Sequence, residues 1–195
     1  MAIKAEEALL HWNYFIALES DFEQVSRYIE FDSKNFKTYS IELAHLLLAS
    51  SSEVDVIAKG VCNLVEPNKP AENINHYQDI IMRNTPDFSK EQIFVPRFSL
   101  TLKPWSNWKS GTNPLWWRSY NNVKHQRNDH FEDANLKNVL NSIAGLLVVV
   151  FYYYRLKFSQ EDPSIRNRDV TRKLIPESEF LRLDESYYYR HLLLE

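Results

Sequence analysis

Apolar side chains recur at helical spacing along most of this chain, and this pattern constrains the fold more than any other feature. In residues 3–31 the apolar positions follow one another at alternating steps of three and four, which is typical of a helix with one buried face. These positions are Phe15, Leu18, Phe22, Val25 and Ile29. Residues 36–64 and 130–158 carry the same kind of pattern, and residues 74–82 carry a shorter one. The sequence therefore predicts helices that pack against one another.

Glycine is scarce, because the 195 residues include only three glycines beside 14% aromatic residues. This composition favours long helices over a turn-rich β-sandwich. A chain of this length with 44% hydrophobic residues can bury the core of one domain. We expect an all-α bundle of four to five helices over residues 1–158. Residues 159–195 are predicted to be a polar C-terminal tail that forms short strands or reaches across a dimer partner.

Polar residues mark several of the expected helix starts. Asn35 or Ser40 can cap the second helix. Asp129 with Glu132 offers a capping box for the helix over residues 130–158. These residues set the helix boundaries that the sequence predicts.

The segment over residues 88–108 breaks the helical pattern. It is rich in β-branched and aromatic side chains but is interrupted by Pro96 and Pro104. Proline cannot donate a ladder hydrogen bond, so this segment is predicted to be an edge strand or an extended excursion that lies over the bundle. It would precede a helix that begins at about Leu115.

Several protein classes are disfavoured by composition. Cys62 is the single cysteine, which excludes an internal disulfide and a set of thiolates for structural zinc and favours a cytoplasmic protein. The first residues carry charges inside their apolar stretch, so we expect no signal peptide. The longest apolar run, residues 143–154, is 12 residues long and falls short of the roughly 20 that span a bilayer. It is predicted to be a buried helix, with no membrane contact.

Charge is unevenly distributed along the chain. The net charge is −3, which argues against a protein that coats nucleic acid by bulk electrostatics. Residues 92–128, however, contain six Lys or Arg and no Asp or Glu, and four of the five tryptophans lie in the same window. A basic, aromatic segment can receive a phosphate backbone with stacked bases, dock an acidic partner, or be solvated surface only. The candidate RNA-binding or partner-binding residues are Lys109, Trp116, Lys124 and Arg127.

Within this window, residues 114–131 concentrate the groups that bind or move protons. If the stretch is helical from Leu115, Arg118, Asn122 and His125 lie on one stripe, because offsets of four and seven return to the same face. The alternative is that the aromatic residues pack a core while Arg118 and His125 bond to nearby backbone. We find no glycine-rich phosphate loop, no H-E-x-x-H motif, no nucleophile elbow and no carboxylate array, so no metal or cofactor is expected.

The string R-S-Y-N-N-V-K-H from Arg118 to His125 resembles the R-x4-6-H signature of the HEPN superfamily. The wider string WW-x-x-YN-x-VKH-x-R, followed by F-x-x-AN, is similar to uncharacterised bacterial HEPN-like proteins. The resemblance covers residues 3–158. It implies an α-helical bundle that is usually dimeric, and many members are metal-independent ribonucleases of toxin–antitoxin, phage-defence and RNA-processing systems.

The resemblance also implies roles for individual residues. Arg118 matches the catalytic arginine and His125 the catalytic histidine, with Ser119 in the polar slot, where Asn or Asp is more usual. Asn122 would position the phosphate or orient the imidazole. Two such motifs would face each other across a homodimer and transfer the RNA 2′-hydroxyl onto its own phosphodiester without a metal.

Two functional hypotheses follow from the resemblance. The first is an endoribonuclease, and the second is a non-catalytic HEPN-like module that binds RNA, a nucleotide or a partner protein. A nucleotidyltransferase-like antitoxin is a candidate partner for either. The remaining hypothesis is an unrelated helical protein whose motif only packs a core.

Overall fold

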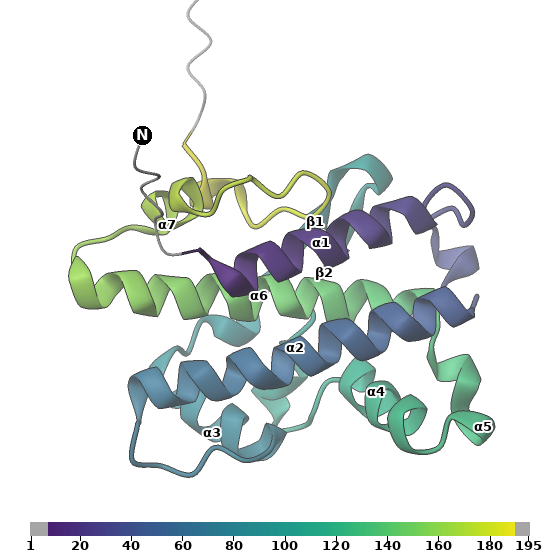
Figure 1. Ribbon diagram of the computed structural model, residues 1–195, viewed down its shortest axis with the longest axis horizontal. Coiled ribbons are helices and arrows are strands. Elements are labelled where there is room, and N and C mark those ends of the chain that lie inside the picture. The colour runs from purple at the N-terminus through teal and green to yellow at the C-terminus, as the bar shows by residue number, and fades with distance from the viewer. Residues whose placement is uncertain (1–7, 190–195) are drawn as a thin grey trace, which may run out of the picture.

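The computed structural model describes residues 8–189 and shows an all-α bundle with one small hairpin (Figure 1). The helices are α1 (Leu10–Val25), α2 (Ile41–Val65), α3 (Ile74–Asn84), α4 (Leu115–His125), α5 (Arg127–His130), α6 (Leu136–Glu161) and α7 (Asn167–Lys173). The strands are β1 (Ile93–Val95) and β2 (Leu100–Leu102), and the 3-10 turns are η1 (Ser33–Asn35), η2 (Phe88–Lys90), η3 (Pro96–Phe98), η4 (Ser106–Ser110), η5 (Phe131–Asp133) and η6 (Glu185–Tyr187). The predicted all-α bundle is confirmed.

The helix α6 is the centre of the bundle. It lies between α1 and α2 in Figure 1 and packs against α2 along much of its length. By length and composition it is the one helix among residues 8–189 that could cross a membrane, but 78% of its most apolar window is buried inside the protein. It is therefore a core helix of the bundle, and the buried helix that was predicted from the apolar run over residues 143–154 is confirmed.

The start of α6 differs from the prediction. The helix begins at Leu136, because the side chain of Asn135 caps it by accepting a hydrogen bond from the Asn138 amide at 3.1 Å. The preceding residues form α5 and η5 instead of a first helical turn. The capping box that was predicted from Asp129 and Glu132 is therefore wrong.

The first two long helices are shorter than predicted at the connection between them. The helix α1 ends at Val25, where the hydroxyl of Ser26 donates to the Glu23 carbonyl at 2.6 Å and the chain turns away. The helix α2 begins after Ser40, whose Oγ accepts from the Leu43 amide at 3.1 Å, so this predicted cap is confirmed. Residues 3–7 of the first predicted helix lie outside the described residues.

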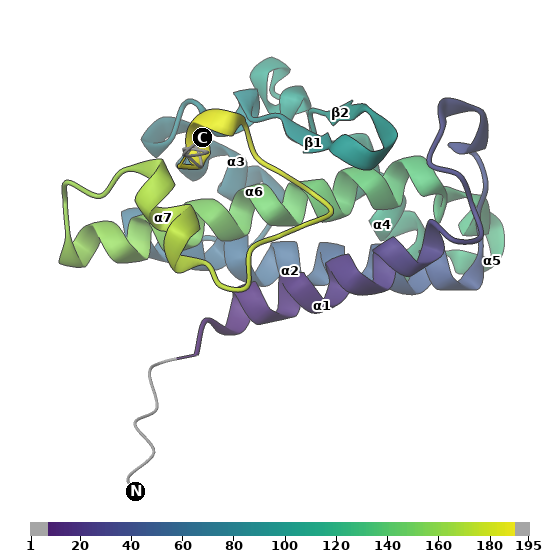
Figure 2. The same cartoon turned by 90° about the horizontal axis from the view of Figure 1, so that it is seen from above.

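The excursion before α4 is an antiparallel hairpin. Its register pairs Ile93 with Leu102 and Val95 with Leu100, and η3 forms the turn. At the end of this turn Ser99 adopts a left-handed φ of 51°. Figure 2 shows the hairpin beside α6, on the side away from α1. The predicted extended excursion over the bundle is confirmed, and it places η4 and α4 against α6.

The C-terminal segment is not a polar tail over its described part. After α7 the chain returns along the bundle, and a β-bridge joins Arg182 to Phe94 of the hairpin. Its buried apolar side chains are Leu174, Phe180, Leu181, Leu183 and Tyr187. These residues belong to the same hydrophobic core as the helices, so the segment as far as Tyr189 packs on its own chain. The predicted boundary at residue 158 is corrected, because the core continues through this segment, and residues 190–195 lie outside the described part.

Candidate functional site

The buried face of α4 fixes the orientation of the motif. Trp116 donates from its indole Nε1 to the Pro104 carbonyl at 2.9 Å, and its ring packs directly against Gly145 of α6. Four further residues of α4 are buried, namely Trp117, Ser119, Tyr120 and Val123. Because these residues share the inward face, the opposite face of α4 is presented to solvent.

Arg118 and His125 lie on that outer face. They are seven residues apart, so they are displaced by about 10 Å along the helix and by about 20° around it. Both are exposed. Among residues 8–189, neither side chain has a hydrogen-bond or ion-pair partner. The structure therefore contradicts the alternative in which Arg118 and His125 bond to nearby backbone within one protomer.

Ser119 and Asn122 are held by α6 and by η5, which precedes it. Asn138 donates from Nδ2 to the Oγ of Ser119 at 3.0 Å and to the Asp133 carbonyl at 2.9 Å. Asn122 donates to the Asp133 carboxylate at 2.7 Å. These bonds tie α4 to η5 and α6 on the side next to Arg118 and His125, so Ser119 and Asn122 act as tethers of the helix.

The remaining basic candidates lie at different places. The ammonium of Lys124 donates to the Tyr120 hydroxyl at 3.2 Å and lies 5.3 Å from the centre of that ring. Arg127 is exposed in α5, just beyond the end of α4. Lys109 is exposed in η4, which is not part of the motif helix. Lys124 and Arg127 therefore flank the end of α4 that carries His125.

The tryptophans do not form a binding surface. Trp105, Trp108, Trp116 and Trp117 are 0%, 3%, 3% and 7% exposed. Trp105 also donates to the Gly145 carbonyl at 3.1 Å, so two indoles close on the same glycine of α6. A base cannot stack on a ring that is covered by protein. The prediction that Trp116 contacts RNA or a partner is therefore wrong.

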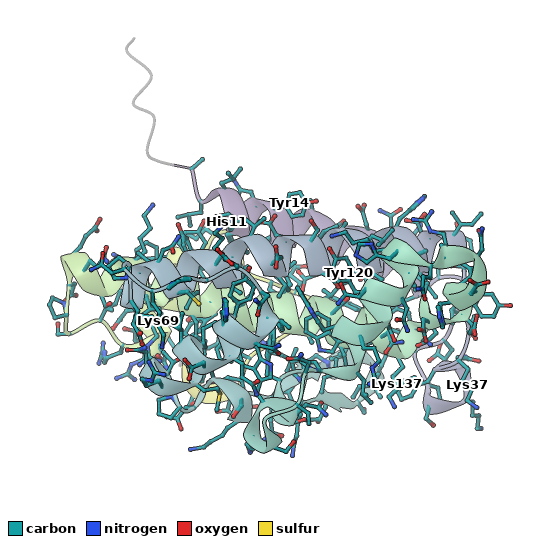
Figure 3. The ribbon with its side chains drawn as sticks, turned by 90° about the horizontal axis from the view of Figure 1, so that it is seen from below. His11, Tyr14, Lys37, Lys69, Tyr120 and Lys137 are labelled. Atoms are coloured by element: carbon teal, nitrogen blue, oxygen red, sulfur yellow. The ribbon has the colours of Figure 1, made fainter. Side chains whose placement is uncertain are left out.

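Two lysines that the sequence patterns did not single out lie at the same end of the bundle. Figure 3 shows Lys37 and Lys137 side by side, at the end of the molecule that carries α4 and its Tyr120. The Lys137 amide donates to the Phe36 carbonyl at 3.2 Å, which brings the two lysines together. The sequence patterns missed this proximity, because the two lysines are a hundred positions apart and each is an ordinary exposed lysine.

The outer face of α4 carries a guanidinium and an imidazole as its functional groups. Among residues 8–189, no group of three or more His, Cys, Asp or Glu side chains is placed to hold a metal ion. The outer face of α4 instead offers a guanidinium that can bind phosphate oxygens and an imidazole that can act as a general acid or base.

Comparison of the whole chain with models of protein families, with curated proteins and with solved structures gave no match. The proposed function therefore rests on the geometry of α4.

Proposed function

We propose that this chain is a metal-independent endoribonuclease of the HEPN type that acts as a homodimer, with Arg118 and His125 as its catalytic residues. The observation that supports this most is the state of the two side chains. Both are exposed on one face of α4 and have no partner among residues 8–189, whereas Ser119 and Asn122 are engaged in holding the helix. A reactive pair must be free to meet its substrate, and a rigid helix improves its placement.

The proposed reaction needs only these two kinds of side chain. The ribose 2′-oxygen attacks the neighbouring phosphorus, and the bond from phosphorus to the 5′-oxygen breaks. A neutral imidazole accepts the 2′-hydroxyl proton, and an imidazolium gives a proton to the departing 5′-oxygen. The guanidinium stabilises the added negative charge on the five-coordinate phosphorus. The products are a 2′,3′-cyclic phosphate and a 5′-hydroxyl.

A second protomer would complete the site. The pair lies on an open helix face of a single protomer, and two proton-transfer groups are needed for the two proton steps. His125 from each copy would supply them if the outer faces of two α4 helices met. Leu115 begins the same face and is 59% exposed, so it offers apolar contact for such a dimer. Lys124 and Arg127 would then border the groove and bind RNA phosphates.

Cleavage of RNA in the presence of EDTA tests the proposal. The purified protein is expected to release fragments that end in 2′,3′-cyclic phosphate. His125→Ala and Arg118→Ala are each expected to lower the rate at least about 100-fold. Since both side chains are exposed and unpartnered, the melting temperature and the circular dichroism spectrum should not change.

His45→Ala and Arg27→Ala are matched controls, because both residues are exposed and lie outside α4. They should cleave RNA like the original protein. Light scattering should give the mass of a dimer. A protein that stays monomeric, or a cleavage rate that survives His125→Ala, would contradict the proposal.

One observation favours a second candidate, a non-catalytic module of the same type. Catalytic histidines are commonly oriented by a carboxylate or carbonyl, and no such group holds the His125 ring among residues 8–189. In that case Arg118, Lys124 and Arg127 would bind RNA, a nucleotide or an acidic partner protein without cleavage. RNA binding that Arg118→Ala weakens, with no turnover in the original protein, would identify this module.

We place the proposed activity in the cytoplasm, in a toxin or phage-defence role. An antitoxin or nucleotidyltransferase-like protein that covers the basic face of α4 would restrain it. Co-purification with such a protein, lost on Arg118→Glu, would support this part of the proposal.

A further inference from the structure

The C-terminal segment and α7 enclose a second site, far from α4. A cavity of about 300 Å³ is lined by Arg168, Thr171, Arg172, Glu177, Arg182 and Tyr188. A larger hollow of about 1080 Å³ adjoins it between the hairpin and η6, and both share Arg168, Arg182 and two tyrosines in their walls. In Figure 1, α7 lies at one end of α6 and α4 lies toward the other. This cavity is therefore separate from the Arg118 and His125 face.

The smaller cavity has an excess of positive charge. Three guanidinium groups line it beside one carboxylate, and that carboxylate, Glu177, is paired with Arg182 at 2.9 Å. Neither Arg168 nor Arg172 has an ion pair among residues 8–189. Asp169, the carboxylate next to Arg168 in sequence, is instead bound by Arg166 and by a tyrosine hydroxyl. Two cations are thus left to face the cavity without counter-charge.

Tyrosine rings hold two of these guanidinium groups in place. The guanidinium carbon of Arg182 lies 4.2 Å from the ring centre of Tyr188, and that of Arg168 lies 5.2 Å from the ring centre of Tyr189. The guanidinium of Arg168 has no hydrogen-bond acceptor among residues 8–189, so its N–H groups are available to an anion, whereas Arg182 already donates from Nη2 to Glu177. Arrangements of this kind bind phosphate oxygens through two parallel hydrogen bonds.

The adjoining hollow has different chemistry. Its walls carry the apolar side chains Phe94, Leu100 and Leu183 and the hydroxyl groups of Ser99 and Thr101. These groups suit a flat ring and a sugar. Two carboxylates, Asp184 and Glu185, also line it and would repel a phosphate. A ligand with a base at one end and phosphate at the other would therefore bind in one direction, with the phosphate among the arginines.

We propose that this cavity and its hollow bind a nucleoside phosphate, with the phosphate held by Arg168 and Arg172, which have no ion-pair partner among residues 8–189. The site does not depend on the proposed ribonuclease, because no residue of α4 lines it. We take a mononucleotide as the ligand, because one arginine-lined cavity adjoins one hollow with apolar and hydroxyl groups in its walls. A bound nucleotide would join α7, the hairpin and the C-terminal segment.

Calorimetric titration of the full chain with ATP, inorganic pyrophosphate and adenosine tests the proposal. ATP is expected to bind more tightly than pyrophosphate, and adenosine to bind least. Arg172→Ala should weaken ATP and pyrophosphate binding about tenfold, because it removes one charge-assisted contact. Arg172 is exposed and unpaired, so this variant should fold normally.

Arg27→Ala is the matched control, because Arg27 is an exposed arginine on the segment after α1 and outside the cavity. It should leave ATP binding unchanged. Equal weakening by Arg27→Ala and Arg172→Ala would reduce the effect to general attraction of anions and overturn the site. Binding of adenosine as tight as that of ATP, or no ATP binding by the folded protein, would overturn it as well. Displacement of ATP by single-stranded RNA but not by ADP would assign the cavity and its hollow to RNA instead.

Discussion

Asn138 of α6 donates a hydrogen bond from Nδ2 to the Oγ of Ser119 on α4 at 3.0 Å, one position after Arg118. The same nitrogen also donates to the Asp133 carbonyl, so a single amide joins three elements. The orientation of the proposed catalytic face therefore depends on Asn138, a side chain of α6 that is not part of that face.

Replacement of Asn138 should loosen α4. We expect Asn138→Ala to lower the free energy of unfolding by about 1 to 2 kcal/mol, because Ser119 is buried and loses its donor. If the proposed activity holds, kcat should fall while KM changes little. Asn141→Ala is the control, since within the described part of the chain the Asn141 side chain bonds only to the Lys137 carbonyl of its own helix. Urea unfolding and initial cleavage rates measure both effects, and equal behaviour of the two variants would count against a positioning role.

The close approach of Trp116 to Gly145 predicts intolerance of any side chain there. A Cβ at Gly145 would lie 2.9 Å from a ring carbon of Trp116, which is itself locked by its bond to Pro104. Gly145→Ala should cost about 1 to 3 kcal/mol of stability. Gly60→Ala is the comparison, because its Cβ meets the half-buried Tyr153 ring at 3.1 Å and alanine favours the helix. It should be nearly neutral in urea unfolding, and a similar loss in both variants would refute this account.

Glu19 should make stability depend on pH. Burial raises the pKa of Glu19, although Ser178 and the Leu181 amide donate to its carboxylate. A folded pKa above the unfolded value means that the folded state holds the proton more tightly. The contribution of Glu19 to stability is therefore full at low pH and declines as pH rises from about 4.5 through the raised folded pKa. Denaturation from pH 4 to pH 8 should show that the free energy of unfolding of Glu19→Gln rises toward pH 8 relative to that of the original protein. A difference that stays constant with pH would exclude this effect.

Tyr187 should anchor the end of the chain. Its hydroxyl donates to the Oε1 of Glu91 at 2.6 Å, and Tyr152 of α6 donates to the same atom at 2.7 Å. We expect Tyr187→Phe to destabilise the protein by about 1 to 2 kcal/mol. Tyr189→Phe, which removes an exposed hydroxyl from Asp169, should cost less than about 0.5 kcal/mol. Thermal unfolding of the two variants gives the comparison.

Helical spacing predicted most of the fold because burial follows it closely. Phe15, Leu18, Phe22 and Val25 are all buried on one face of α1. Boundaries were harder, because Asp129 and Asn135 are both good N-cap residues. The amides of Leu136 and Lys137, which follow Asn135, donate to the carbonyls of Thr38 and Phe36, and these contacts from a distant segment favour a start at Asn135. Local sequence does not contain that information.

The stripe on α4 was predictable in part. Spacing placed Arg118 and His125 together, and both are exposed on one face. The same arithmetic puts Trp116, Tyr120 and Val123 opposite them, which indicates burial, yet the basic charge of the window favoured a surface role for Trp116. The partners of Ser119 and Asn122, namely Asn138 and Asp133, could not be predicted, because they lie on either side of the start of α6, which the sequence misplaced.

The packed C-terminal segment was missed for a different reason. Its buried residues follow neither a helical nor an alternating pattern, since they fill gaps between elements already in place. Arginines 168, 172 and 182 come together only when this segment folds back on α7. Irregular segments of this kind give no periodic signal to a sequence reading.

The bridge between Phe94 and Arg182 has a consequence for synthesis of the protein. The hairpin leaves the ribosome long before its partner does, so the apolar surfaces beneath the C-terminal segment stay uncovered while the rest of the chain is translated. The mature core can close only after Tyr187 has emerged from the exit tunnel. A ribosome that stalls after the hairpin but before Tyr187 would thus release a protein with an open core, which chaperones and proteases recognise.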